Sequence, residues 1–211
     1  MPITANEMVK ELEQQIKAGS WNKVDPEDAI CEDLAGMRLY DEPIWGFGNA
    51  ADLLFETWKR PEVIHPEAML PRDWLAEAKT VISYFFPFTE QIRHANAEDM
   101  ARTSDAWLHG RIEGQEMISA VGRELCHILE EAGYKAVCPS LDPRFRMLAD
   151  YTKGCLAGKD HALCSAYIKE NTRPPHGPHK KVRYGCGKCQ VDVPCAAGIP
   201  KRRGISGSIL V

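Results

Sequence analysis

The stretch "SDAWLHGRIEGQEMISAVGRELCHILEEAG", residues 104–133, carries the longest regular pattern in the chain. Its apolar residues recur at helical spacing, and Gly133 stands where helix C-termini favour glycine. The pattern predicts one long helix from about Ser104 to Ala132. Three glycines inside it each lower helix propensity by up to about 1 kcal/mol relative to alanine, so they indicate close backbone packing or the approach of a ligand. These glycines are Gly110, Gly114 and Gly122.

Two shorter helices are expected on the N-terminal side of this stretch. "TANEMVKELEQQIKAG", residues 4–19, combines capping-box spacing with an apolar stripe, which is typical of an amphipathic helix. "ADLLFETWKR", residues 51–60, predicts a helix that Pro61 ends, followed by an irregular, proline-rich connection. Between them, "DEPIWGFGNA", residues 41–50, contains a Gly-Phe-Gly loop that lacks the full phosphate-binding pattern. We assign this loop no chemistry, because a buried anchoring tryptophan explains Trp45 equally well.

Strand-forming residues flank the long helix on both sides. "AKTVISYFFPF", residues 78–88, concentrates β-branched and aromatic residues and predicts a buried central strand from Thr80 to Phe86. "YKAVCP", residues 134–139, follows the long helix after a two-residue turn and predicts another strand. A helix that feeds a strand in this way indicates an α/β (α+β) fold, a sandwich in which helices cover strands.

The composition is that of a globular protein with one sizeable core and a smaller appended module. The chain has 211 residues, of which 44% are hydrophobic. No apolar run approaches the roughly 18 to 20 residues that span a bilayer, and the acidic, polar N-terminus does not resemble a signal peptide. We therefore expect a cytoplasmic protein with no membrane partner, in which clustered cysteines are metal ligands or redox groups.

Charge divides the chain into an acidic body and a basic tail. Residues 1–140 hold 13 Lys and Arg against 25 Asp and Glu, a net charge of −12. Residues 141–211 hold 13 against 5, a net charge of +8, and the two parts sum to −4. The tail could attract phosphates of nucleic acid or a charged redox partner, compensate the negative charge of a thiolate-bound cluster, or form a solvated face.

Five of the eight cysteines crowd into the last third of the chain. Within it, "YGCGKCQVDVPC", residues 184–195, has the spacing C-x2-C-x5-C. Soft thiolates favour zinc or an iron-sulfur cluster. Zinc would take four thiolates, or three with the imidazole of His176 or His179, but zinc ribbons usually show two paired motifs, so the spacing favours a cluster. The candidate ligands are Cys155, Cys164, Cys186, Cys189 and Cys195.

Four stretches together resemble the epoxyqueuosine reductase-like iron-sulfur proteins, which are related to corrinoid-dependent reductive dehalogenases. In chain order they are "AKTVISYFFPFTEQIRHAN", "WLHGRIEGQEMISAVGRELCHILEEAGYKAVCPSLDPRF", "GKDHALCSAY" and "RYGCGKCQVDVPC". The resemblance implies a corrinoid-binding α/β body and a ferredoxin-like module with two [4Fe-4S] clusters that pass electrons to cobalt. In epoxyqueuosine reductase itself the substrate is a tRNA wobble nucleoside, so the resemblance also implies tRNA as a partner.

This chain departs from that family between "CPSLDPRF" and "GCLAGKDH". Only "RMLADYTK" stands where the family has a corrinoid-pocket segment and a C-x2-C-x2-C-x3-C-P motif. We therefore expect one [4Fe-4S] cluster and no full cobalamin (corrinoid) site. Cys164, Cys186 and Cys189 would be ligands of this cluster, with Cys195 or Cys155 as the fourth.

The resemblance aligns Asp142 with the proton-donating aspartate of the reductase. Its residues alone indicate an Asp that opens a turn before Pro143. The expected protein has an α/β body over residues 1–150 and a cysteine-rich, ferredoxin-like module over residues 151–211. It would relay single electrons to a cofactor or a redox partner protein; the alternatives are a zinc-stabilised module whose tail binds a partner or RNA, or cysteines left without metal.

Overall fold

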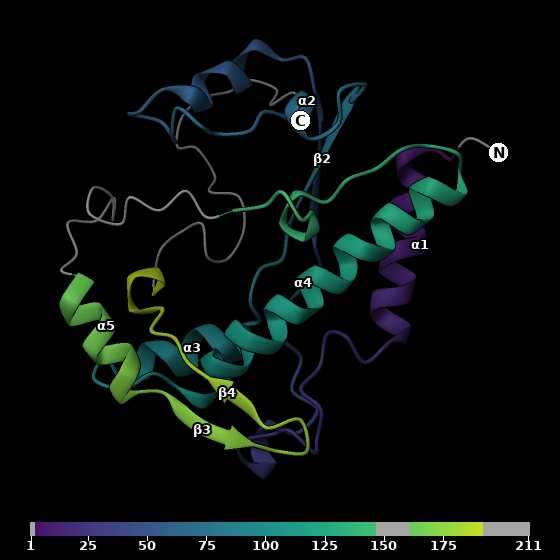
Figure 1. The fold of residues 1–211 in the computed structure, drawn as a ribbon. Helices are drawn as coiled ribbons and strands as arrows, with labels where there is room; N and C mark the ends of the chain where they lie inside the picture. Colours follow the sequence, from purple (N-terminus) through teal and green to yellow (C-terminus); the bar gives the residue numbers. More distant parts are fainter. Residues whose placement is uncertain (1–2, 147–160, 192–211) are drawn as a thin grey trace, which may run out of the picture.

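The structure, a computed structural model, describes residues 3–146 and 161–191 (Figure 1). The predicted boundary between body and module, at residue 150, lies outside these residues. Helices and strands are both present, which confirms the mixed class. In chain order the elements are α1 (Ala5–Ala18), η1 (Glu32–Leu34), β1 (Ile44–Asn49), η2 (Leu53–Lys59), α2 (Pro71–Trp74), β2 (Thr80–Phe85), α3 (Glu90–Glu98), α4 (Asp105–Glu131), η3 (Pro139–Leu141), α5 (His161–Glu170), β3 (Arg173–His176), β4 (Lys181–Arg183) and η4 (Lys188–Gln190).

Helix α4 is the longest element and confirms the prediction made from its sequence. It has 27 residues and begins where the Ser104 hydroxyl accepts a hydrogen bond of 3.2 Å from the Trp107 backbone N–H. Helix α3 lies beside its N-terminal part, and α1 lies beside its C-terminal half (Figure 1). Charged residues interrupt α4, and the described part of the chain contains no helix that is both long and apolar enough to cross a membrane.

The N-terminal helix α1 also forms as predicted. The Glu7 backbone N–H donates to the Thr4 hydroxyl at 3.3 Å, and the Glu7 carboxylate accepts from the Thr4 backbone N–H at 2.9 Å. This reciprocal pair satisfies two backbone groups that a helix start otherwise leaves without partners.

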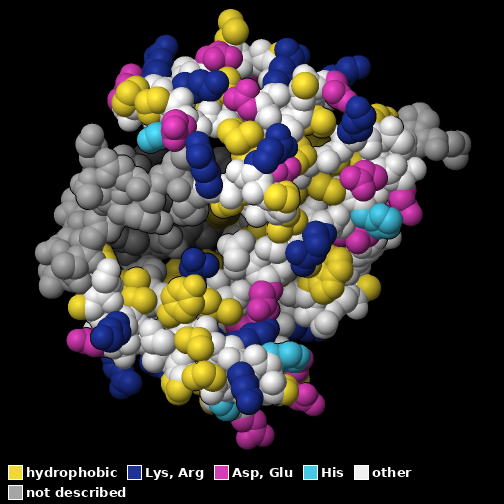
Figure 2. All heavy atoms as spheres, viewed as in Figure 1, with side chains coloured by type: hydrophobic (Ala, Val, Ile, Leu, Met, Phe, Trp, Pro, Cys, Tyr) yellow, Lys and Arg dark blue, Asp and Glu magenta, His cyan; other side chains and the backbone are white. Residues whose placement is uncertain are grey.

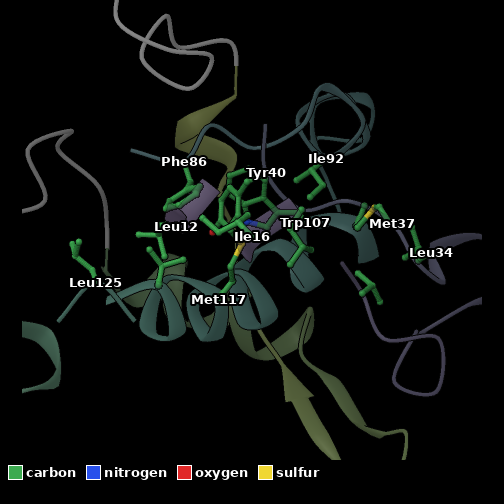
Figure 3. Close-up of a cluster of buried hydrophobic side chains, with 14 of the residues drawn as sticks. Leu12, Ile16, Leu34, Met37, Tyr40, Phe86, Ile92, Trp107, Met117 and Leu125 are labelled. Atoms are coloured by element: carbon green, nitrogen blue, oxygen red, sulfur yellow. The ribbon is translucent and has the colours of Figure 1, made fainter. Parts of the chain in front are cut away.

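The hydrophobic core lies between α1, α4 and the chain that leads from α1 into β1. Figure 3 shows Leu12 and Ile16 of α1 against Met117 of α4, with Tyr40 and Phe86 beside them. Leu12 is 0% exposed and Met117 is 2% exposed. Burial of one such side chain contributes about 1.5–3 kcal/mol, so this contact is a main source of the stability of the fold.

The three glycines within α4 permit close packing of other side chains. A Cβ at Gly110 would lie 2.9 Å from the Phe88 ring, and one at Gly122 would lie 2.8 Å from Cys138 Sγ. At Gly114 a Cβ would overlap the Tyr40 hydroxyl. The packing interpretation of these glycines is therefore confirmed.

Replacing Gly114 with alanine is expected to lower the free energy of unfolding by about 1–3 kcal/mol, the usual cost of overpacking a core. The loss should occur although alanine favours a helix over glycine. Denaturant unfolding followed by circular dichroism measures it, with the exposed neighbour Gln115→Ala as control. Equal or greater stability of Gly114→Ala would contradict the contact with Tyr40.

The strand predicted at Thr80 to Phe86 forms, but its surroundings differ from the prediction. Within the described residues, strand β2 pairs with β1 alone in an antiparallel two-stranded sheet, with Ile44 opposite Phe85. It is therefore a partly exposed strand, not a buried central one, and Phe85 is 41% exposed. Strand β1 contains the Gly-Phe-Gly stretch that was expected to be a loop; pairing with β2 outweighs the poor strand propensity of glycine.

Two further predictions need correction. Residues 134–139 form no strand, because no described segment pairs with them, and Pro139 instead starts the short helix η3. The helix predicted over residues 51–60 is a 3-10 helix, η2, whose start is capped by the Asp52 carboxylate. The strands of the described residues make two separate antiparallel pairs, β1–β2 and β3–β4, and so do not form the predicted sandwich.

Candidate metal centre

Cys186 and Cys189 belong to one tight turn that lies on the N-terminal end of α4. Gly187 between them has φ 66° and ψ 2°, a left-handed conformation that favours glycine. The Gln190 backbone N–H closes the turn by donating to the Gly187 carbonyl at 2.9 Å. A Cβ at Gly187 would overlap the Trp107 indole, so the turn rests directly on that ring.

Asn96 at the end of α3 connects to both sides of this turn. Its side-chain amide donates to the Cys186 carbonyl at 3.3 Å, and its side-chain oxygen accepts from the Lys188 ammonium at 2.9 Å. Asn96 is 0% exposed. A buried amide whose hydrogen bonds are made holds its partners in one geometry, so Asn96 fixes the turn on the body.

The Lys188 ammonium lies against the C-terminal end of α3. It donates to the backbone carbonyls of Asn96 at 2.6 Å and Asp99 at 2.8 Å, which suits a cation at the negative end of a helix. Burial lowers the pKa of Lys188, and the nearby Cys186 and Asp99 oppose that change. The side chain therefore anchors the turn and is not directed to solvent.

Thr103 brings helix α5 next to the residue that precedes the turn. Its hydroxyl donates to the Gly185 carbonyl at 3.2 Å and lies 3.5 Å from the Tyr167 hydroxyl. Its backbone N–H donates to the Asn171 side chain at 3.0 Å. Cys164 precedes Tyr167 by one helical turn, and Gly185 directly precedes Cys186. Thr103 therefore contacts a residue next to each of these two cysteines.

Of the five predicted ligands, two have described side chains. The thiols of Cys164 and Cys186 are half-buried. For Cys189 the structure describes the backbone only, and Cys155 and Cys195 lie outside residues 3–146 and 161–191. Among the residues that it does describe, no three His, Cys, Asp or Glu side chains converge as a complete metal site requires.

Of the two histidines that could have completed a zinc site, His176 and His179, the second is occupied elsewhere. His179 lies in the β3–β4 turn, and strand β4 separates that turn from Cys186 (Figure 1). Its Nδ1 is 2.7 Å from the carboxylate of Asp28, a residue that is 1% exposed. Burial acts to raise the pKa of Asp28, but His179 and Lys181 outweigh it and hold the pKa below its ordinary value.

A buried ionic cluster joins β4 to α4 just before the cysteine turn. Arg183 is 0% exposed; its Nε donates to Glu113 Oε1 at 2.9 Å, and its Nη2 donates to the Asp28 carbonyl at 2.8 Å. His109 Nε2 accepts from the Ile30 backbone N–H, so a neutral His109 carries its proton on Nδ1, 3.3 Å from Glu113 Oε2. Burial opposes ionisation of Glu113, but His109 and Arg183 lower the pKa of this carboxyl overall.

Four basic residues of the described C-terminal part pair with carboxylates of the acidic body. On the face that Figure 2 shows, Lys and Arg side chains are interspersed with Asp and Glu. Pairing within the chain therefore accounts for part of the basic charge that follows the acidic body. The sequence alone did not suggest this explanation. The pairs are Arg146 with Glu67, Arg173 with Asp105, Lys181 with Glu116 and Asp28, and Arg183 with Glu113.

Asp142 accepts a bidentate pair of hydrogen bonds from Arg144. The Arg144 Nε and Nη2 atoms lie 2.8 Å and 2.9 Å from its two carboxylate oxygens. These bonds, with one from the Arg144 backbone, lower the pKa of Asp142 to about 2. An ionised carboxylate is the opposite of what a proton donor requires, so the geometry favours the turn role of Asp142 over the role that the resemblance implies.

Removing the partner of Asp142 should restore an ordinary titration. In Arg144→Gln the pKa of Asp142 is expected to rise from about 2 towards the usual value near 4. Carboxyl-detected NMR titration measures the midpoint, and Arg146→Gln is the matched control because Arg146 pairs with Glu67. Since the pKa is lowered, the stability from this pair is present above about pH 4 and lost as the pH falls towards 2. A midpoint that Arg144→Gln leaves unchanged would exclude this pairing.

Comparison with known proteins finds no family model, no curated protein and no solved structure that matches this chain.

Sequence reasoning missed the residues that hold the turn. Asn96, Thr103 and Trp107 lie far from the cysteines in the sequence, and nothing in their own surroundings marks them as a binding surface for the turn. A usable signal existed for the ionic cluster, because His109 and Glu113 are four residues apart on one face of a helix whose neighbouring positions are apolar.

Proposed function

We propose that this chain is an iron-sulfur protein that binds one [4Fe-4S] cluster and relays single electrons to a partner or a bound cofactor. The proposal rests on the Cys186–Cys189 turn, which Gly187 shapes and which Asn96, Thr103 and Trp107 hold against the body. Thiolates are the ligands of such clusters, so the donor set fits. The ligands would be Cys164, Cys186 and Cys189, with Cys155 or Cys195 as the fourth.

A bound cluster would supply one-electron transfer. The chain's own residues would position the thiolates: Asn96 and Lys188 fix the backbone on either side of Gly187, and the Trp107 ring covers one side of the turn. For the partner we infer a redox protein in preference to RNA, because most of the described basic side chains after residue 140 are paired with carboxylates or carbonyls. A tRNA substrate and a bound corrinoid stay predictions of the resemblance.

Metal and sulfide analysis after anaerobic purification or reconstitution tests the proposal. The wild-type chain should contain about four irons and four acid-labile sulfides, the content of one cluster, with the matching brown absorption. Cys186→Ser should lose both, while Cys31→Ser, a change of an exposed cysteine at the start of η1, should retain them.

Two outcomes would refute the electron-relay function. Stoichiometric zinc without sulfide would identify a zinc-stabilised module, for which the same two-cysteine turn is suited. A chain that takes up neither metal would indicate that its cysteines no longer act as ligands.

A further inference from the structure

Gly122 of α4 leaves a space that the Cys138 sulfur and the Tyr84 hydroxyl occupy. A Cβ at Gly122 would lie 2.8 Å from Cys138 Sγ and 3.3 Å from the Tyr84 hydroxyl, so both atoms occupy room that a side chain would fill. Cys126 follows Gly122 by one helical turn on the same face of α4. Because a helical side chain leans back over the turn before it, the Cys126 sulfur is directed towards the same space.

Cys126 and Cys138 are neighbours in the fold and are not used by the candidate metal centre. Both thiols are free and half-buried, and Cys138 lies close enough to Cys126 to shift the pKa of its thiol. Helix η3, which starts directly after Cys138, packs on α4. We propose that Cys126 and Cys138 oxidise reversibly to an internal disulfide that ties residues 138–144 to α4.

The oxidant is a low-molecular-weight disulfide such as oxidised glutathione. The Cys138 thiolate attacks one sulfur of the oxidant, whose S–S bond breaks, and the first glutathione leaves as a thiol after taking a proton. The Cys126 thiolate then attacks the Cys138 sulfur, which forms the protein disulfide and releases the second glutathione. Two electrons pass from the protein sulfurs to the oxidant, and the two protein thiol protons end on the two glutathione thiols.

The surroundings of Cys126 indicate the order of these steps. Burial, together with the nearby Cys138 and Glu130, raises the pKa of Cys126 to about 11. The Tyr84 hydroxyl of β2 also belongs to this cluster, and burial raises its pKa to about 12. A thiol that is protonated at neutral pH is a poor first nucleophile, so Cys138 reacts first and Cys126 resolves the mixed disulfide.

The disulfide would restrain a segment that now depends on hydrogen bonds. Arg144, six residues after Cys138, donates to the backbone carbonyls of Asp73 at 3.1 Å and Trp74 at 2.8 Å. Oxidation should therefore slow hydrogen exchange of the backbone amides in residues 138–144, because local opening of this segment would be blocked at its N-terminal end.

Peptide mapping of the full chain after treatment with oxidised glutathione tests this inference. Trypsin cleaves after Arg123, Lys135 and Arg144, which places Cys126 in peptide 124–135 and Cys138 in peptide 136–144. Mass spectrometry without reduction should find these two peptides joined, and dithiothreitol should separate them. Cys126→Ser should instead retain glutathione on Cys138, and Cys31→Ser should behave as the wild type.

The inference would be overturned if the wild-type chain kept glutathione on Cys138 or joined either peptide to a different cysteine. Since this readout uses the wild-type chain, it holds even if Cys126→Ser fails to fold. It is independent of iron content, so the failure of one proposal would leave the other standing.

Discussion

Replacing Arg183 with leucine is expected to lower the free energy of unfolding by about 3–5 kcal/mol, the usual cost of removing one partner of a buried ion pair. The guanidinium is 0% exposed and bonds to the Glu113 carboxylate and the Asp28 carbonyl. Without it, the buried Glu113 carboxylate would lose its guanidinium partner. Since domains of this size have a total stability of about 5–15 kcal/mol, this change alone removes a large part of it.

The cross-strand neighbour Arg173 provides a matched control. Arg173 lies opposite Arg183 in the β3–β4 pair and bonds to Asp105 at 2.7 Å, but its side chain is 23% exposed. Its replacement by leucine should cost only about 1 kcal/mol, because solvent screens a partly exposed pair. Denaturant unfolding followed by circular dichroism compares the two variants.

A double variant separates the ion pair from simple packing. If the penalty comes from an unpaired buried charge, Glu113→Leu combined with Arg183→Leu should recover much of the stability lost in Arg183→Leu. Equal costs for Arg173→Leu and Arg183→Leu, or strictly additive costs in the double variant, would show that the buried pair has no special role.

Replacing Gly187 with alanine is expected to abolish the proposed binding of a cluster by the cysteine turn while the body stays folded. Two effects act together: alanine costs about 1 kcal/mol in a left-handed conformation, and its Cβ would overlap the Trp107 indole. Trp107 is 5% exposed and packs against Phe88 at a ring-centroid distance of 5.0 Å, so it has little room to move. The turn must therefore lift from α4, which separates Cys186 from Cys164.

Gly133 is the matched control for this prediction. It also has a positive φ, 86°, but a Cβ there would have no neighbour within 4 Å. Gly133→Ala should thus show the backbone penalty of about 1 kcal/mol and keep its metal content. Iron and sulfide analysis measures the difference, and the indole N–H NMR signal of Trp107, one of five tryptophans, reports the displaced turn without depending on metal. Normal iron content and an unshifted indole signal in Gly187→Ala would refute the contact.

The parts of the fold that the sequence predicted are those encoded by residues close together along the chain. The capping pair Thr4 and Glu7 and the limits of α4 depend on residues within about one turn of each other, and both were predicted correctly. The cysteine turn belongs to the same class, because the spacing of Cys186 and Cys189 and the glycine between them are local.

The failed predictions about strands share the opposite property. Strand β1 exists because β2 pairs with it. Residues 134–139 form no strand because no described segment pairs with them. Strand propensity describes how well a residue fits a pleated, half-buried surface, and the sequence does not show whether that surface is present.

The sequence by itself therefore determined helix α1 with its capping box, the long helix α4, and the close spacing of Cys186 and Cys189 around a glycine. Only the tertiary structure decided what holds that turn: Asn96 binds Cys186 across 90 residues, and Arg183 reaches Glu113 across 70. It also decided that four described basic residues after position 140 pair with carboxylates of the acidic body. The physical reason is that helix caps and tight turns are satisfied by backbone groups nearby in sequence, whereas a buried charge or amide needs a partner that only folding brings within hydrogen-bonding distance.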